Sequence, residues 1–242
     1  MDIISINPLL RRRIEYISNG NKSYVWLKEP KITLQNGFPH CGLVALLMMR
    51  DTLNFPPIEE TKDLLNVAID KGFSNKGEIF SVRWLSEIAK IFWNDSAIFD
   101  VLDKLPNDKT LVEELSSSDI VYLIPYDCGK NFEPVFHNGN NAHWSLITGF
   151  VLVKNSNQDE ENNVNKTINF YTPAQTINIQ SSSLYVIGYQ GKSRHPGVWN
   201  YKSLIDSNLQ LHTCREDGKN EFKFDINGME DLRGKCLRVK RR

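Results

Sequence analysis

Nine consecutive residues from Cys41 to Met49 (CGLVALLMM) carry no charge and no strongly polar side chain. A run that is apolar on every side predicts a helix buried in the core rather than an amphipathic surface helix. Residues 37–40 (GFPH) have the composition of a turn, and Pro56-Pro57 follow the end of the run near Asn54. We therefore predict a buried helix whose first residue is Cys41.

The remaining pattern places helices before strands along the chain. Further helices are predicted from near Pro57 to Gly72 and from Ser81 onward. Strands are predicted at residues 120–124, 143–153, 168–171, 184–189 and 236–239. This order is typical of an α+β fold with an antiparallel sheet. We predict one domain over residues 1–242, helical over about 35–118 and with its sheet over about 119–242. The polar segment 154–166 is predicted to be a flexible hairpin loop between two of the strands.

Composition and cysteine spacing exclude several classes of protein. Lys+Arg and Asp+Glu both number 29, so the net charge of +0 does not favour nucleic-acid binding. The four cysteines form no C-x-x-C pair, so neither a zinc ribbon nor a thioredoxin-like motif is expected. The N-terminus lacks a signal-peptide pattern, and no apolar run approaches the roughly 20 residues that span a bilayer. We therefore expect a cytoplasmic protein with reduced thiols that does not bind a membrane.

Cys41 and His143 are the candidate catalytic pair. A thiol attacks as the thiolate, and a helix N-terminus favours that charge, so we expect a lowered pKa for Cys41. Gly42 is expected to leave space beside the sulfur for a substrate carbonyl. His143, at the start of a predicted strand, supplies a base once the fold brings the two together. Gln35, shortly before Cys41, is a candidate donor to the oxyanion of a tetrahedral intermediate.

Each of these residues has a simpler interpretation when taken alone. A cysteine before an apolar helix is usually a small buried hydrophobe, and a histidine at a strand start is more often structural. His40 adjoins Cys41 but lies in a turn, where we expect its side chain to point away from the thiol. Only the combination of Gln35, Cys41 and His143, in this order and on these elements, favours catalysis.

Five segments, in order along the chain, carry a family resemblance. They are residues 34–46 (LQNGFPHCGLVAL), 77–81 (GEIFS), 142–144 (AHW), 190–193 (QGKS) and 207–211 (SNLQL). The first resembles the nucleophile segment of the actin maturation protease family, and the others resemble further motifs of the same family. That family is related to papain-like and bacteriocin-leader cysteine peptidases. The resemblance therefore implies a papain-like fold, with the nucleophile helix packed on the sheet.

The resemblance also implies an activity. Family members remove an N-acetylated first residue, Met or Cys, from newly made actin. By this analogy Cys41 attacks the first peptide bond, and water activated by His143 releases the acyl group from the enzyme. The implied reaction needs no metal and no organic cofactor. The actin N-terminus is then the protein substrate. Lys192 and Arg194 are candidates to bind its acidic residues by charge complementarity, with a solvated loop as the alternative.

Two departures from the family pattern leave alternatives open. Related leader peptidases place an Asp before a Pro as the third catalytic member, where this sequence has Thr172. The group that orients His143 is then Asn169, Asp206, Asn208 or a backbone carbonyl. We assign no third catalytic residue. Vertebrate relatives also carry a proline-rich N-terminal extension suited to profilin. This sequence has no such run, so we do not expect recruitment through profilin.

Two other functions stay open on the sequence. One is a catalytically weak pseudo-protease that keeps the fold and binds actin, which the missing Asp favours. The other is a cysteine hydrolase acting on another N-terminal or amide substrate. The motifs at 190–193 and 207–211 favour actin processing, through the resemblance alone.

Overall fold

A computed structural model describes residues 7–58, 61–155, 168–173, 177–214 and 221–242. The strands are β1 (Ser23–Leu27), β2 (Ala97–Leu102), β3 (Ile120–Asp127), β4 (Ala142–Lys154), β5 (Ile168–Phe170), β6 (Ser182–Tyr189), β7 (Gly197–Asn200) and β8 (Cys236–Arg241). The helices are α1 (Pro8–Ser18), α2 (Cys41–Leu53), α3 (Thr61–Asp70), α4 (Val82–Trp93), α5 (Asp108–Ser116) and α6 (Tyr201–Leu209).

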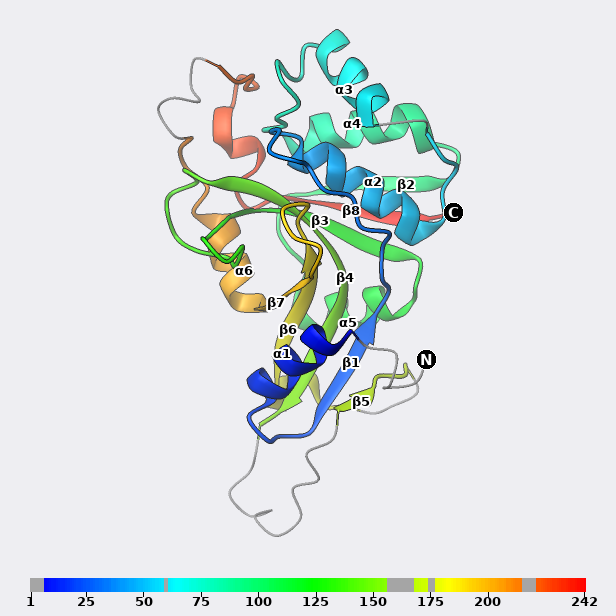
Figure 1. The fold of residues 1–242 in the computed structure, drawn as a ribbon, viewed down its shortest axis with the longest axis vertical. Helices are drawn as coiled ribbons and strands as arrows, with labels where there is room; N and C mark the ends of the chain where they lie inside the picture. The colour runs from blue at the N-terminus through cyan, green and yellow to red at the C-terminus, as the bar shows by residue number, and fades with distance from the viewer. Residues whose placement is uncertain (1–6, 59–60, 156–167, 174–176, 215–220) are drawn as a thin grey trace.

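The strands form an eight-stranded mixed sheet with the order β2-β8-β3-β4-β1-β5, and β6 joins β4 while β7 joins β6. The long strand β4 is its centre, since it pairs with β3, β1 and β6. Figure 1 shows α2, α3 and α4 gathered at one end of the molecule, near β2 and β8, with α1 and β5 toward the other end. The first residues of β4 therefore lie beside the helical end.

Both faces of the sheet are covered, because successive side chains of a strand point to opposite faces. Along β3, Leu123 belongs to the hydrophobic cluster that includes α2 and α4. Its neighbours Tyr122 and Ile124 belong to a second cluster that includes α5 and α6. The strand is buried along its whole length, as expected for a strand with packing on both sides.

Helix α2 confirms the prediction made from the apolar run. It begins at Cys41, and ten of its residues are buried: Gly42, Leu43, Val44, Ala45, Leu46, Leu47, Met48, Met49, Thr52 and Leu53. The helix packs on β4 and β3, so the nucleophile segment rests on the sheet. The expected α+β class is confirmed, with one difference: the sheet is mixed, because β1 and β5 run parallel.

Several elements were not predicted. Strands β1 and β2 lie within the stretch where helices or irregular chain were expected, and α6 lies within the stretch assigned to the sheet. The expected hairpin between the strands at 143–153 and 168–171 is wrong, since β1 lies between β4 and β5. Most of the intervening loop falls outside the described residues. Among the helices that the structure does describe, none is both long and apolar enough to cross a membrane. That residues 1–242 form a single domain stays a prediction.

Candidate active site

A cavity of about 180 Å³ opens at the N-terminus of α2, where β4 begins. Cys41, His143, Gln35 and Lys192 all line it. The structure thus brings together four of the five site residues expected from the sequence. Arg194 is exposed and is not among the described residues that line this cavity.

The Cys41 sulfur is held where α2 meets β4. The first helical hydrogen bond of α2 runs from the Val44 N–H to the His40 carbonyl at 2.8 Å. The backbone N–H groups of Trp144 and Gly42 favour the negative charge of a Cys41 thiolate and so act to lower the pKa of the thiol. Trp144 directly follows His143, so the start of β4 supplies both the histidine and one of these N–H groups. The His40 ring lies 2.9 Å from the Lys76 carbonyl oxygen through Nε2, as expected for a side chain that turns away from the thiol.

Gly42 permits a close approach between α2 and the Trp144 indole. A β-carbon at position 42 would lie 3.2 Å from both Cδ1 and Nε1 of Trp144. The indole is fixed there because its Nε1–H donates to the Ile79 carbonyl at 2.8 Å. The glycine therefore makes room for the Trp144 indole, and its role in leaving space beside the sulfur for a substrate carbonyl stays a prediction.

His143 is buried and oriented by the backbone of Gln190. Its Nε2 lies 2.6 Å from the Gln190 carbonyl oxygen. A carbonyl oxygen only accepts, so Nε2 carries the hydrogen and Nδ1 is left as the acceptor nitrogen of the ring. Burial, reinforced by the positive charge of Lys192, lowers the pKa of His143 to about 3. The imidazole is therefore neutral at physiological pH and able to accept a proton.

The orienting group is a backbone carbonyl, one of the alternatives left open by the sequence. Thr172 lies just after β5. In the sheet, Phe170 of β5 pairs with Val25 of β1, and Val25 also pairs with Val151 of β4. Position 151 is roughly 27 Å along β4 from His143 at about 3.4 Å per residue, so Thr172 does not stand at the catalytic position. The segment that lies beside the start of β4, and so beside His143, is the end of β6, which is followed by Gln190.

The other three candidates for orienting His143 make their resolved contacts elsewhere. Asn169 donates to the Ser23 carbonyl at 3.3 Å. Asp206 is paired with Lys202 on the surface of α6 at 2.6 Å. Asn208 is buried and donates to the Pro125 carbonyl at 2.8 Å, so it ties α6 to β3.

Burial raises the pKa of the Cys41 thiol, which is opposite to the shift expected from its place at a helix N-terminus. The Trp144 N–H, Lys192 and the Gly42 N–H favour the thiolate, but removal from water outweighs them. The cavity thus holds a neutral thiol and a neutral imidazole. Such a pair can react by transferring the thiol proton as the sulfur attacks.

Gln35 is linked to the same turn that orients His143. Its backbone N–H donates to the Gly191 carbonyl at 2.9 Å. Gly191 has φ +72, and a β-carbon there would lie 2.9 Å from Cγ1 of Val44 in α2, so both conformation and packing require glycine. The Gln35 Oε1 is buried and accepts no hydrogen bond from the described residues. Consecutive carbonyls of one turn therefore hold the His143 ring and the Gln35 backbone.

Asp127 organises the loop that forms another wall of the cavity. Its buried carboxylate accepts from the backbone N–H groups of His137 (2.7 Å), Gly139 (2.9 Å) and Asn141 (3.1 Å). It also accepts from Nε2 of Gln210 at 2.9 Å. Gly139 and Asn141 line the cavity, so a carboxylate behind the wall sets the position of the wall.

Comparison with known proteins places this chain in a family. The sequence profile described as "Actin maturation protease-like, C-terminal domain" matches residues 31–151, which contain Gln35, Cys41 and His143. The chain belongs to the actin maturation protease-like family. Its fold also resembles a crystal structure of a C39-like peptidase from Bacillus anthracis, with a TM-score of 0.52 and 11% identity over 90% of this chain and 98% of that one.

Curated relatives of this family are proteases by name. The chain is 33% identical to "Actin maturation protease" of Drosophila melanogaster, over 83% of this chain and 66% of that protein. It is 30% identical to "Actin maturation protease" of Homo sapiens, over 74% of this chain and 53% of that protein. The matches therefore span about half to two thirds of the relatives' own length.

Residues that sequence reasoning missed lie inside the motifs that carried the family resemblance. Gln190 begins QGKS, and its side-chain Oε1 accepts from the Lys192 N–H at 2.7 Å, which shapes the turn. Gln210 lies in SNLQL and holds Asp127. Glu78 lies in GEIFS and is buried at the cavity. Among the residues with described positions, no three His, Cys, Asp or Glu side chains form a group that could hold a metal ion.

Proposed function

We propose that this member of the actin maturation protease-like family is a cysteine-type aminopeptidase that removes an N-acetylated Met or Cys from the actin N-terminus in the cytoplasm. Cys41 is the nucleophile, His143 the base, and Gln35 with the Cys41 backbone N–H the oxyanion donors. The observation that carries the proposal is that Cys41 and His143 line the same cavity, with Nε2 of His143 2.6 Å from the Gln190 carbonyl oxygen. The thiol and an imidazole oriented to accept a proton therefore face one space.

The proposed reaction has two steps. The Cys41 sulfur attacks the carbonyl carbon of the first residue while His143 Nδ1 takes the thiol proton. That proton passes to the nitrogen of the second residue as the peptide bond breaks, leaving a thioester on Cys41. His143 then takes a proton from water, which attacks the thioester and releases the N-acetyl amino acid. The proton returns to the Cys41 sulfur.

The substrate assignment rests on the names of the relatives and on charge. Lys192 is exposed at the cavity, and its charge acts on both Cys41 and His143. An acidic second residue, exposed when the first is removed, is complementary to that charge. Arg194 lies outside the cavity, so its positive charge would attract the acidic substrate during approach without contacting it in the site.

The pseudo-protease alternative depended on a missing carboxylate for orienting the histidine. The Gln190 carbonyl provides an acceptor at 2.6 Å, so that reason for inactivity is removed. The proposal therefore favours an enzyme over a protein that only binds actin.

The test uses acetyl-Met-Asp and acetyl-Cys-Asp peptides of actin type and follows the loss of the first residue by mass. Wild type should release N-acetyl-Met or N-acetyl-Cys, whereas Cys41→Ala and His143→Ala should lower the rate by at least about 1,000-fold. Cys236→Ala, which changes a buried thiol in the other hydrophobic cluster, and His195→Ala, at an exposed position, are the controls. Binding of the peptide without loss of mass would contradict the proposal.

A second arm tests the contact with the acidic residue. Lys192→Glu should raise KM for the acetyl-Met-Asp peptide by about 10-fold or more, since it replaces an attraction with a repulsion. Arg194→Glu is the matched control with the same charge change, and we expect a smaller rise. An unchanged KM for Lys192→Glu would remove this contact from the proposal.

A further inference from the structure

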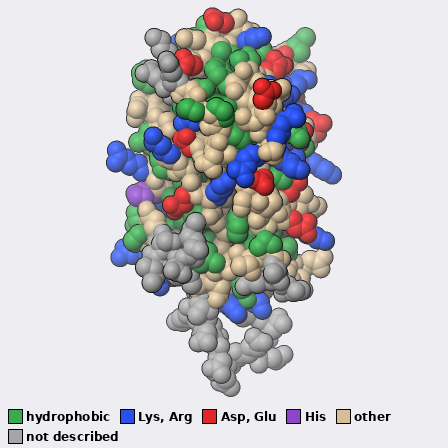
Figure 2. Space-filling view, turned by 90° about the vertical axis from the view of Figure 1, so that its right-hand side faces the viewer, with side chains coloured by type: hydrophobic (Ala, Val, Ile, Leu, Met, Phe, Trp, Pro, Cys, Tyr) green, Lys and Arg blue, Asp and Glu red, His purple; other side chains and the backbone are tan. Residues whose placement is uncertain are grey.

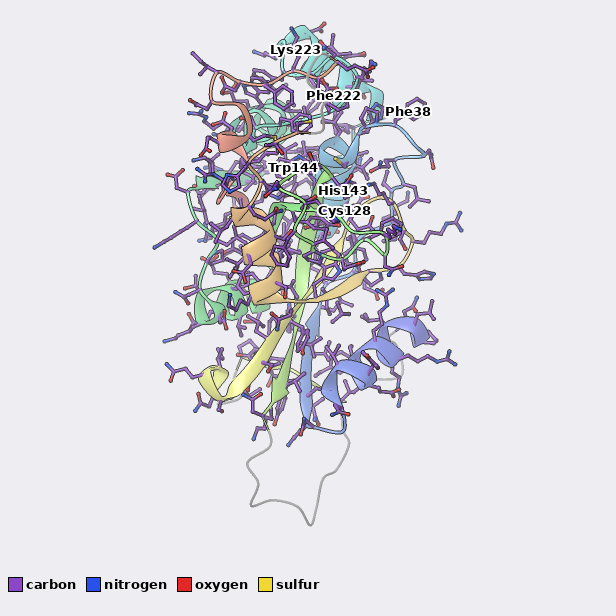
Figure 3. All side chains as sticks on the ribbon, turned by 90° about the vertical axis from the view of Figure 1, so that its left-hand side faces the viewer. Phe38, Cys128, His143, Trp144, Phe222 and Lys223 are labelled. Carbon is purple, nitrogen blue, oxygen red and sulfur yellow. The ribbon has the colours of Figure 1, made fainter. Side chains whose placement is uncertain are left out.

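The cavity has two chemically different parts. One part carries Lys192, which is exposed at the cavity and whose positive charge acts on Cys41 and His143. The other part, which we name the apolar arm, is lined by Ile79, Phe80, Cys214, Phe222 and Leu232. Figure 3 shows Phe222 on one side of Trp144 and His143, with Cys128 on the other side.

Phe222 lines the apolar arm, and hydrogen bonds hold the chain on both sides of it. The residue before it, Glu221, accepts through its carbonyl from Nδ2 of Asn75 at 2.7 Å. The residue after it, Lys223, donates its backbone N–H to Oε1 of Glu78 at 3.0 Å. The Phe222 ring itself packs on Phe80, with the two ring centroids 5.6 Å apart. A wall held by two backbone positions and a ring contact is suited to selecting ligands by size.

Glu78 supports this wall from the opposite segment. Its buried carboxylate accepts from the backbone N–H groups of Asn75 and Lys76, each at 2.8 Å, and from the Ser74 hydroxyl at 3.0 Å. The same carboxylate accepts from Lys223, so it links the turn at 74–77 to the segment that carries Phe222. The apolar arm is therefore part of a preformed pocket.

We infer that the apolar arm receives the side chain and acyl cap of the residue that is released, and that Phe222 sets the largest first residue accepted. The inference rests on the proposed function. An acylated first residue carries no N-terminal charge, so it suits the apolar arm, while the acidic residue that follows suits Lys192. The volume of about 180 Å³ lies below the roughly 300–1,000 Å³ of sites for drug-sized ligands, so the cavity fits one capped residue rather than a length of peptide.

The experiment measures selectivity rather than activity alone. Acetyl-X-Asp peptides with X as Ala, Met or Phe give the ratio of kcat/KM for the Phe peptide to that for the Ala peptide. Phe222→Ala enlarges the arm and should raise this ratio by about 10-fold or more, whereas Phe222→Trp shortens the arm and should lower it. The two variants act in opposite directions, so either one decides the matter if the other fails to fold.

Phe224→Ala is the matched control. Phe224 packs on the same Phe80 ring, at 4.6 Å between centroids, but does not line the cavity, so its variant should keep the wild-type ratio. Lys192→Glu should also keep it, because the residue acts on the other part of the cavity. Active Phe222 variants with the wild-type ratio would overturn the inference and leave the proposed function intact. A wild-type enzyme that cleaves no acetyl-X-Asp peptide would overturn both.

Discussion

The imidazole Nε2 of His143 lies 2.6 Å from the backbone carbonyl oxygen of Gln190, and this contact fixes which ring nitrogen is free to accept a proton. The next carbonyl, that of Gly191, accepts the Gln35 N–H at 2.9 Å. One turn after β6 thus positions the candidate base and the candidate oxyanion donor. Because both contacts use backbone atoms, the site depends on the conformation of this turn more than on a third catalytic side chain.

Gln190→Ala should lower kcat by about 10-fold with little change in KM. The substitution leaves the Lys192 N–H, now 2.7 Å from Oε1 of Gln190, without its acceptor, which loosens the turn that presents the Gln190 carbonyl to His143. A loss of about 1.4 kcal/mol in transition-state stabilisation corresponds to that factor. Steady-state kinetics on the acetyl-Met-Asp peptide measure it, with Gln180→Ala at an exposed position as control. Wild-type kcat in Gln190→Ala would contradict this role.

The alkylation rate of Cys41 should rise with pH throughout the alkaline range. Burial raises the pKa of this thiol, so only a small fraction is ionised at neutral pH. Iodoacetamide labelling followed by mass, with Cys41→Ala to identify the labelled site, gives the profile. A rate that is already constant from pH 5 to 8 would show a thiolate–imidazolium pair at rest and would contradict the expectation of a neutral thiol and a neutral imidazole.

The free energy of unfolding should fall as the pH is lowered from about 6.5 toward 3. The pKa of His143 is about 3 in the folded protein, whereas an unfolded histidine has a pKa near 6.5. Between these values the unfolded chain binds more protons, so stability rises with pH, by at most about 1.4 kcal/mol per pH unit from this residue.

Urea unfolding of wild type and His143→Gln at pH 7, 6 and 5 tests this linkage. The difference in unfolding free energy between the two should change with pH in the stated direction, because the variant lacks the titrating group. His195→Gln removes an exposed histidine and should retain the wild-type slope. The same slope in His143→Gln as in wild type would rule out His143 as its source.

The sequence predicts the secondary structure around Cys41 and His143, because that structure follows from the local pattern of apolar and polar residues. Cys41 opens a helix because an apolar run follows a turn, and His143 opens a strand because the residues after it are β-branched and apolar. Their meeting depends on β4 packing against α2, which the family resemblance implied and the structure contains. On the face of the molecule shown in Figure 2, basic and acidic side chains are both present and interspersed. This distribution agrees with the equal numbers of basic and acidic residues in the sequence.

The remainder depends on long-range pairing that no local pattern encodes. Thr172 was placed beside His143 because it precedes a proline, yet strand register puts β5 next to β1 and Gln190 next to the imidazole. The expected low pKa of Cys41 followed from the helix N-terminus alone. It failed because the loss of hydration of the thiol at the α2–β4 junction is a property of the folded molecule.

Asp127→Asn should lower the free energy of unfolding by about 3 kcal/mol and raise KM for the acetyl-Met-Asp peptide. The buried carboxylate accepts three backbone N–H groups and the Gln210 amide. An asparagine has one acceptor oxygen, and its NH₂ group would face some of these donors, so buried N–H groups are left unpaired at about 1–3 kcal/mol each. The loop wall at Gly139 and Asn141 would then move relative to the cavity.

Urea denaturation and amide hydrogen exchange measure the two consequences. Exchange should accelerate at the amides of His137, Gly139 and Asn141, which donate to the carboxylate. Asp206→Asn is the matched control, because that carboxylate is exposed and pairs only with Lys202 in the resolved contacts, so its removal should cost less than about 1 kcal/mol. Unchanged exchange at these three amides in Asp127→Asn would mean that the wall is held by other contacts, such as the 2.7 Å bond from the Thr213 N–H to the Asn138 carbonyl.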